Sequence, residues 1–349
     1  MAASFTAETL HTGKSIIDGT TALVENGTIQ HSSGLLLVDM LNLDNRASNS
    51  GDRLGDSMPV EFWGGRLRLI CNTSAPTSER IGAMLFSGGG SIEFLQASNP
   101  ALPITLIAAS LDRSFGSFGY VDVDPANGKR ILLDNPPPVP GIASVGGPTA
   151  RPVVPYLRAG YALDSLVTYD TGANPLDPSD DVGLRRLDPA TEFASAIGSG
   201  GVPENVWIKS NQTVSSASTV NALIVESDLT INDTLSIASG SITLRQRGPD
   251  VPQIVGTGRL RVAGEAIISA AGPGVIGVPL EAQKMTVTGE VTLAKANDVA
   301  GGTWLIGDIA SRAQAGLCQS PGDFGSSDST PASRSAPSRH TNRSDSGTR

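Results

Sequence analysis

Apolar and polar residues alternate along much of the chain, in short segments that are bounded by glycine, asparagine or aspartate. Alternation with a period of two places every second side chain on the same face of a β-strand. The clearest segments, between Trp207 and Ile309, are Thr219–Val225, Leu229–Asn232, Leu235–Ile237, Ser241–Leu244, Arg259–Val262, Lys284–Val287 and Val291–Leu293. The pattern predicts an all-β protein made of many short strands.

Glycines between these segments suggest how the strands are connected. Five of them, Gly240, Gly248, Gly256, Gly264 and Gly272, follow one another at a constant step of eight residues. A step of eight suits a strand of five or six residues and a tight turn. Three such steps make roughly 24 residues, which is one coil of a three-sided β-solenoid in which each coil packs on the next. We therefore predict a parallel β-helix, or β-solenoid, as the fold.

Composition and charge narrow the class of protein. Charged residues make up 17% and aromatic residues 4% of the chain, and no stretch sustains the apolar period of an amphipathic helix. The formal net charge of −9 argues against a nucleic-acid partner, because phosphate binding needs clustered Lys and Arg. The most apolar run, Leu35 to Leu43, is too short to span a membrane as a helix. No transmembrane segment is predicted.

The composition divides the chain into four regions. Residues 1–113 and 206–309 carry the strand pattern and are predicted to form solenoid coils. Residues 114–205 are rich in proline and aspartate, and proline disfavours central strands, so we predict an irregular insertion packed beside the solenoid. Residues 310–349 have few large apolar side chains and are predicted to be disordered.

Several blocks share residues with a known family. They are Asp44-Asn45, Asp52-Arg53-Leu54-Gly55-Asp56, Val60-Glu61-Phe62-Trp63-Gly64-Gly65, Ser78-Glu79-Arg80-Ile81-Gly82 and Gly289-Glu290-Val291-Thr292-Leu293. The chain resembles bacterial autotransporter-associated β-strand repeat proteins, although it has Trp304 where that family usually has threonine. The resemblance implies a right-handed parallel β-helix, located outside the cell or at the surface of a bacterium, without catalytic residues. The start, Met1 to Gly19, shows no secretion signal, so we expect Met1 to be an internal start or the native terminus to lie upstream. The C-terminal tail, residues 310–349, is either native sequence or the product of a shifted reading frame.

Candidate chemical sites are few. Gly13-Lys14-Ser15 ends like a phosphate-binding loop, but Glu8 stands where that motif needs glycine. Asp122, Asp124, Asn127 and Gly128 have the composition of a calcium loop, with the third ligand one position late and no closing glutamate. His11, His31 and His340 do not form a metal or triad pattern. We therefore assign no catalytic, cofactor-binding or metal-binding residue.

The acidic residues of the insertion support a second hypothesis. Polysaccharide lyases and glycosidases place carboxylates together for acid/base work, and this region contains Asp164, Asp170, Asp177, Asp180, Asp181 and Asp188. Its only cationic partners between residues 151 and 188 are Arg151, Arg158, Arg185 and Arg186. Loop acids facing solvent are the competing interpretation.

Three functional hypotheses follow. The first is a non-catalytic structural or adhesive segment that contacts extracellular matrix, a glycan or another cell-surface ligand. The second is a polysaccharide-acting enzyme that uses acids between residues 164 and 188, and the third is a truncated fragment without a function of its own. The strand phase adds a structural expectation: Val287 faces inward, and Thr286 lies on the alternate face, where a charge has little effect.

Overall fold

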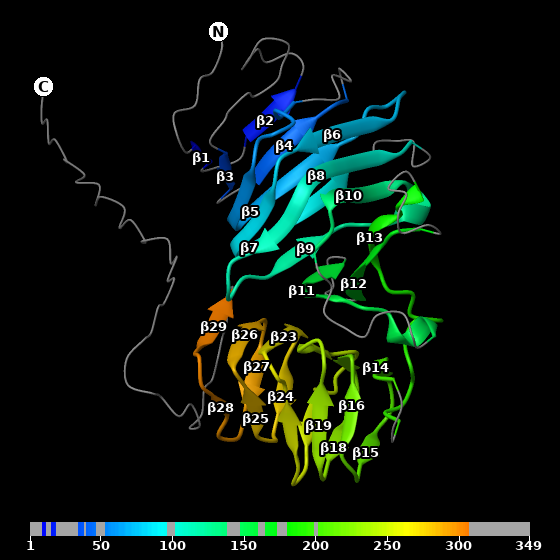
Figure 1. Ribbon diagram of the computed structural model, residues 1–349, viewed down its shortest axis with the longest axis vertical. Helices are drawn as coiled ribbons and strands as arrows, with labels where there is room; N and C mark the ends of the chain where they lie inside the picture. Colours follow the sequence, from blue (N-terminus) through cyan, green and yellow to red (C-terminus); the bar gives the residue numbers. More distant parts are fainter. Residues whose placement is uncertain are drawn as a thin grey trace, which may run out of the picture.

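The computed structural model describes residues 9–11, 15–18, 34–37, 40–46, 53–95, 102–137, 147–159, 165–172, 180–198 and 202–306. These residues form an all-β structure dominated by parallel strands, and its only helical elements are two single 3₁₀ turns, η2 (Pro125–Asn127) and η3 (Pro148–Ala150). Within the described part of the chain, no helix has the length and apolar character needed to cross a membrane. The first strands, β1 and β2, belong to one half of the molecule, and the last strand, β29, belongs to the other half (Figure 1).

The first half, which we call the N-terminal unit, contains thirteen strands. They are β1 (Thr9–His11), β2 (Ser15–Asp18), β3 (Leu35–Leu37), β4 (Met40–Asp44), β5 (Val60–Ile70), β6 (Thr77–Ile81), β7 (Met84–Leu95), β8 (Ile104–Arg113), β9 (Gly119–Val121), β10 (Lys129–Asn135), β11 (Val154–Ala159), β12 (Ser165–Asp170) and β13 (Gly183–Arg186). The pairings among β1 to β10 are parallel, whereas β12 pairs antiparallel with both β11 and β13.

The long strands of this unit each pair with more than one neighbour. Residues 60–62 of β5 pair with β3, and residues 66–70 pair with β4. β8 pairs with β6 and β10 through its first part, and with β7 through residues 111–113. The chain thus passes through three stacks of parallel strands in turn and then returns to the first stack. We call one such pass a circuit.

The second half, which we call the C-terminal unit, contains three parallel sheets. The first consists of β14 (Asn205–Ile208), β17 (Ala222–Val225), β20 (Ser241–Arg245), β23 (Glu265–Ala271), β26 (Lys284–Thr288) and β29 (Thr303–Ile306). The second consists of β15 (Gln212–Val214), β18 (Leu229–Ile231), β21 (Gln253–Val255), β24 (Gly274–Ile276) and β27 (Val291–Leu293). The third consists of β16 (Ser218–Val220), β19 (Thr234–Ile237), β22 (Arg259–Arg261), β25 (Leu280–Ala282) and β28 (Asp298–Val299). Consecutive strands enter the three sheets in strict rotation, and strands lie at all seven segments predicted from the alternation.

The length of a circuit differs between the units. In the N-terminal unit, Thr9, Leu35, Val60, Met84 and Leu111 are successive partners, at separations of 26, 25, 24 and 27 residues. In the C-terminal unit the pairs are Asn205 with Ala222, Leu223 with Ile242, Ile242 with Ile268, Ile268 with Val287, and Val287 with Leu305, at separations of 17, 19, 26, 19 and 18 residues. The predicted length of about 24 residues therefore fits the N-terminal unit but only one circuit of the C-terminal unit. The glycine step of eight that suggested it reflects that one longer circuit.

Each unit has its own apolar interior. In the C-terminal unit, alternate residues such as Leu223, Ile242, Ile268 and Val287 form one inward column with less than 4% exposure. Neighbouring strands in a sheet lie about 4.8 Å apart, so these side chains stack directly on one another. The strand phase predicted for Val287 is correct.

The alternate face of β20, β23 and β26 packs against the N-terminal unit, on the lower side of β8, β9 and β11 (Figure 1). Ile267 of β23 belongs to the core of the N-terminal unit, and Trp207 of β14 belongs to a third cluster with Val153 and Leu166. Thr286 consequently has no exposed surface. Thr286 lies on the alternate face, as expected, but the expectation that a charge there has little effect does not fit its burial, because the N-terminal unit covers this face of the sheet.

The proline-rich region contains β9 to β13, and β11 lies between β9 and β12. Pro155 is part of β11, which contradicts the expectation that proline excludes central strands here. The register of β11 against β12 shifts between Val154 and Arg158, so Pro155 lies at an irregularity, where the missing N–H is tolerated. The predicted disordered tail begins at residue 310 and lies outside the described residues.

Candidate functional site

Three of the blocks that carry the family resemblance, those with Asn45, Arg53 and Glu79, meet inside the N-terminal unit, whereas the block at Gly289 lies in the C-terminal unit. The Glu79 carboxylate accepts hydrogen bonds from the backbone N–H groups of Arg53, at 3.0 and 2.9 Å, and of Leu54, at 2.6 Å. Arg53 Nε donates to Asn45 Oδ1 at 2.8 Å, and Asn72 Nδ2 donates to the Asn45 carbonyl at 2.7 Å. All these side chains are buried, and they tie the loops of successive circuits together. These residues of the motif therefore have a structural role, and their contacts do not indicate chemistry on a substrate.

The acids of the proline-rich region do not converge on one open site. Asp164 and Asp177 lie outside the described residues. Asp170 accepts a hydrogen bond from Arg185 Nε at 2.7 Å, and the other nitrogens of Arg185 bind both oxygens of Glu192 at 2.7 Å. Arg151 Nε lies 3.2 Å from Glu192 Oε1. The four side chains form one ion-pair network beside β12 and β13.

This network changes the pKa of both carboxyl groups. Burial alone would raise the pKa of Glu192, but hydrogen bonds from Arg185 and from the Asp188 backbone N–H outweigh it, so the pKa is lowered. The pKa of Asp170 is lowered in the same way, with burial opposed mainly by Arg185. Both groups are therefore held ionised, whereas a general acid needs a raised pKa.

The remaining acids of the region also have structural partners. Asp181 Oδ2 accepts a hydrogen bond from the Tyr169 hydroxyl at 2.7 Å. Asp188 accepts from the Ala190 backbone N–H at 2.9 Å and from Thr191 Oγ1 at 2.8 Å, and so closes a turn. Asp180 is exposed. These contacts favour the structural interpretation of the acids over the catalytic one.

The calcium-like cluster forms a turn around η2. Asp122 pairs with Lys129 Nζ at 2.8 Å, and Asp124 Oδ2 accepts a hydrogen bond from Asn127 Nδ2 at 2.8 Å. Gly128 has φ of 76° and ends the 3₁₀ turn. Over the described parts of the chain, no group of three His, Cys, Asp or Glu side chains is placed to hold a metal ion. The other sequence candidates are separated or not described: His11 lies on β1 and Ser15 begins β2, while Gly13, Lys14, His31 and His340 fall outside the described residues.

Arg158 is fully buried where the two units meet. Its Nη2 donates to Ser241 Oγ at 2.8 Å, and its Nε lies 3.0 Å from Thr243 Oγ1 and 3.1 Å from Ser269 Oγ. Its Nη1 donates to the carbonyls of Pro155 and Leu157. Burial lowers the pKa of Arg158 to about 10, so the side chain is still protonated at neutral pH. Arg158 fastens β11 to β20 and β23.

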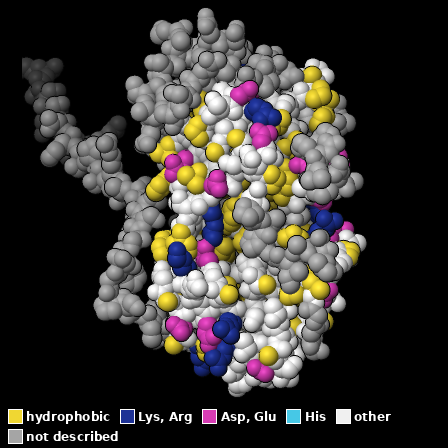
Figure 2. Space-filling view, viewed as in Figure 1, with side chains coloured by type: hydrophobic (Ala, Val, Ile, Leu, Met, Phe, Trp, Pro, Cys, Tyr) yellow, Lys and Arg dark blue, Asp and Glu magenta, His cyan; other side chains and the backbone are white. Residues whose placement is uncertain are grey.

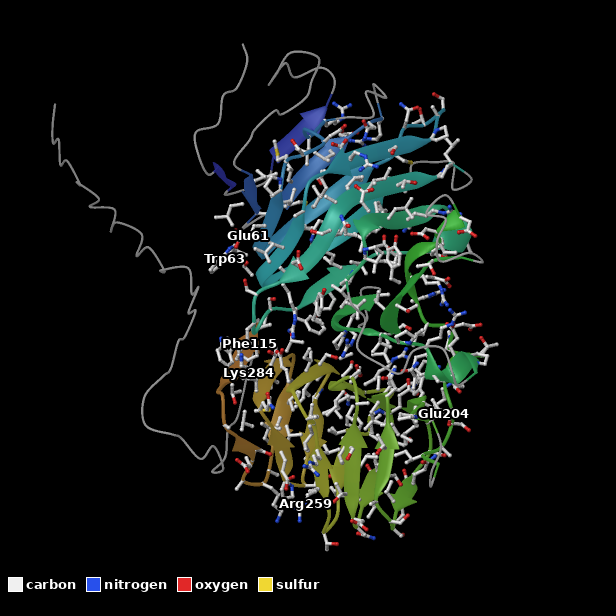
Figure 3. All side chains as sticks on the ribbon, in the orientation of Figure 1. Glu61, Trp63, Phe115, Glu204, Arg259 and Lys284 are labelled. Carbon is white, nitrogen blue, oxygen red and sulfur yellow. The ribbon has the colours of Figure 1, made fainter. Side chains whose placement is uncertain are left out.

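Aromatic side chains gather at one corner of the molecule, and this cluster was not predicted. Trp63 is 49% exposed, and its Nε1 donates to Glu61 Oε1 at 2.7 Å. Phe115 packs edge-on against Trp304, with ring centroids 3.9 Å apart, and Lys284 Nζ lies 4.0 Å from the centre of the Phe115 ring. Figure 3 shows Glu61, Trp63, Phe115 and Lys284 along the same edge, far from Arg259. The contact between Phe115 and Trp304 joins distant parts of the sequence, so no local pattern could reveal it.

Charged side chains on the drawn face lie in small mixed groups. Figure 2 shows Lys and Arg next to Asp or Glu, among hydrophobic side chains and a larger area of uncharged side chains and backbone. Ion pairs among the described residues include Arg66 and Arg68 with Glu93, and Arg259 with Glu281. Such mixed groups are typical of a surface that does not attract a polyanion.

Comparisons of the chain with protein-family models, with curated proteins and with solved structures gave no match.

Proposed function

We propose that the protein is a non-catalytic structural or adhesive segment of a bacterial surface or exported protein, built as a right-handed parallel β-helix. The rotation of consecutive strands through three parallel sheets supports the β-helix, and the stacked apolar columns supply its interior. The low fraction of charged residues fits an elongated scaffold whose outer surface carries the function.

The observation that carries this proposal is the ion-pair network of Asp170, Arg185 and Glu192. A polysaccharide lyase or glycosidase needs carboxyl groups that are open to substrate and that divide the roles of acid and base. Here one arginine engages both carboxylates, and both have a lowered pKa. The network holds β12, β13 and the following turn together, which is a structural task.

Binding and cleavage assays on the same purified chain test the proposal. We expect the protein to bind immobilised extracellular matrix or cell-surface glycans, and to release no reducing ends or unsaturated sugars from acidic and neutral polysaccharides, with or without calcium. Cleavage that is lost in Asp170→Asn and Asp188→Asn, with both variants folded by circular dichroism, would establish the enzymatic alternative instead. Failure to bind any surface material would remove the adhesive role.

A further inference from the structure

We propose that the aromatic corner of Trp63, Gly88, Phe115 and Trp304 is a binding site for the ring faces of a neutral glycan. This inference rests on the proposed adhesive function and gives it a ligand class and a location. Four observations support it: the position of the corner in successive circuits, the exposure of Trp63, the contribution of both units, and the balance of polar groups.

The corner occupies the same place in three successive circuits of the N-terminal unit. Trp63 lies between the two paired stretches of β5, and Gly88 lies at the corresponding bend of β7. Phe115 lies between β8 and β9, which pair with the two stretches of β7 on either side of that bend. Since neighbouring strands are about 4.8 Å apart, two circuits separate Trp63 and Phe115 by about 10 Å along the stack. The aromatic residues are thus arranged along a line, as an extended oligosaccharide requires.

Gly88, at the middle position of this line, has no side chain that could project from the surface. A Cβ atom built on Gly88 would lie 3.7 Å from Trp63 Cε3, in van der Waals contact with the indole ring. Glycine leaves the ring of Trp63 open, and the hydrogen bond from its Nε1 to Glu61 fixes the ring orientation. The hydroxyl groups of Ser87 and Ser114 lie 3.1 Å apart beside Gly88 and add polar contacts.

The C-terminal unit completes the corner. Trp304 of β29 packs on Phe115, and Lys284 of β26 lies over the same ring. Gly116 has φ of 80°, and a Cβ atom there would lie 2.4 Å from the Trp304 ring, so a side chain at this position would displace Trp304. Phe115 and Trp304 both remain partly exposed. The site therefore depends on the two units being fastened together.

The chemistry of the corner matches a sugar ring better than other ligands. The face of an aromatic ring carries partial negative charge, and it attracts the weakly positive C–H groups on the face of a pyranose. Glu61, Lys284 and the two serine hydroxyls can exchange hydrogen bonds with sugar hydroxyl groups. One acid and one lysine leave no net charge, which favours a neutral glycan over a polyanion.

Titration with defined oligosaccharides tests this site. The probes are cellohexaose, maltohexaose and chitohexaose, and the readouts are tryptophan fluorescence and isothermal titration calorimetry on the full chain. We expect at least one probe to bind, Trp63→Ala and Phe115→Ala to weaken that binding about tenfold or more, and Trp63→Phe to retain most of it. Leu95→Ala is the matched control, because Leu95 is an apolar side chain of similar exposure, 47%, at the far end of β7. This variant should bind as the wild type does.

Two outcomes would overturn the inference: no probe binds the wild type, or Trp63→Ala, folded by circular dichroism, binds as tightly as Leu95→Ala does. Either result leaves the proposed adhesive function intact if the wild-type chain still attaches to matrix or cell-surface material. If the wild-type chain binds an oligosaccharide in solution but does not attach to matrix or cell-surface material, the adhesive role is refuted and the glycan site is kept.

Discussion

Arg158 and Ser241 lie 83 positions apart in the sequence, and Arg158 Nη2 donates a hydrogen bond to Ser241 Oγ across 2.8 Å. The contact crosses the junction of the two units, at a place where both side chains are fully buried. The neighbouring acceptors are the hydroxyls of Thr243 and Ser269 and two backbone carbonyls. A cation is thus solvated by neutral oxygens, which fixes the units in one relative position.

Arg158→Ala should therefore weaken the junction. It removes five hydrogen bonds and leaves a cavity among buried hydroxyl groups. The saving in desolvation of the guanidinium offsets part of this loss. We expect the free energy of unfolding to fall by about 2–4 kcal/mol, measured by urea denaturation. Arg186→Ala, which changes an exposed arginine of β13 in the same sheet, is the control and should change it by less than about 0.5 kcal/mol. Equal stability of the two variants would show that Arg158 does not fasten the units.

Val287→Asp and Thr286→Asp should both be strongly destabilising. Val287 faces the interior of the C-terminal unit, and an aspartate there buries a charge among apolar side chains. Thr286 faces the N-terminal unit and donates from its Oγ1 to Glu265, so an aspartate places two carboxylates together in a buried contact. Thermal unfolding should show that each substitution lowers the free energy of unfolding by more than about 3 kcal/mol.

Thr292→Asp on β27 supplies the comparison, because Thr292 is partly exposed on a strand of the second sheet. If Thr286→Asp were as stable as Thr292→Asp, the N-terminal unit would not cover β26 in solution.

The ion-pair network predicts a loss of stability in acid. The pKa values of Asp170 and Glu192 in the folded state lie below their ordinary values of 3.8 and 4.5. The unfolded chain therefore binds protons more tightly, so the stabilisation is present above these ordinary values and is lost as the pH falls through the lower folded values. We expect Glu192→Gln to be less stable than the wild type at pH 7, and to lose less stability between roughly pH 5 and 3. Glu290→Gln, at an exposed site, should keep the wild-type pH dependence. An unchanged pH profile in Glu192→Gln would contradict the role of the network.

Local patterns in the sequence predicted the strands because alternation follows from the geometry of a single strand. The bends were equally local: Gly240 and Gly272 have φ of 77° and 89°, in the left-handed region that glycine favours. The inward position of Val287 followed from the same alternation. These are properties that a few neighbouring residues decide by themselves.

Contacts between distant segments decided the rest. Thr286 has the polarity of a solvent-facing residue, yet the N-terminal unit covers it. Pro155 lies in a paired strand because a shift of register accommodates it. Trp63 was part of a recognised block, but its place in line with Phe115 depends on how the circuits stack. Nothing within a window of ten or twenty residues specifies such relationships.

The glycines of the C-terminal unit offer a test that separates spacing from structural need. Gly258 lies outside the step of eight, but a Cβ atom there would lie 1.9 Å from the Asp233 carbonyl oxygen, because neighbouring circuits approach closely at this point. Gly264 belongs to the step of eight, yet its φ is outside the left-handed region and no heavy atom lies within 4 Å of a Cβ atom built on it. Gly258→Ala should therefore lower the free energy of unfolding by about 2–4 kcal/mol, as two strands are forced apart. Gly264→Ala should leave it unchanged or raise it by up to about 1 kcal/mol, because alanine restricts the unfolded chain. Thermal and urea denaturation of the two variants measure the difference, and a larger loss in Gly264→Ala than in Gly258→Ala would mean that the regular spacing, not the close approach, is what the fold requires.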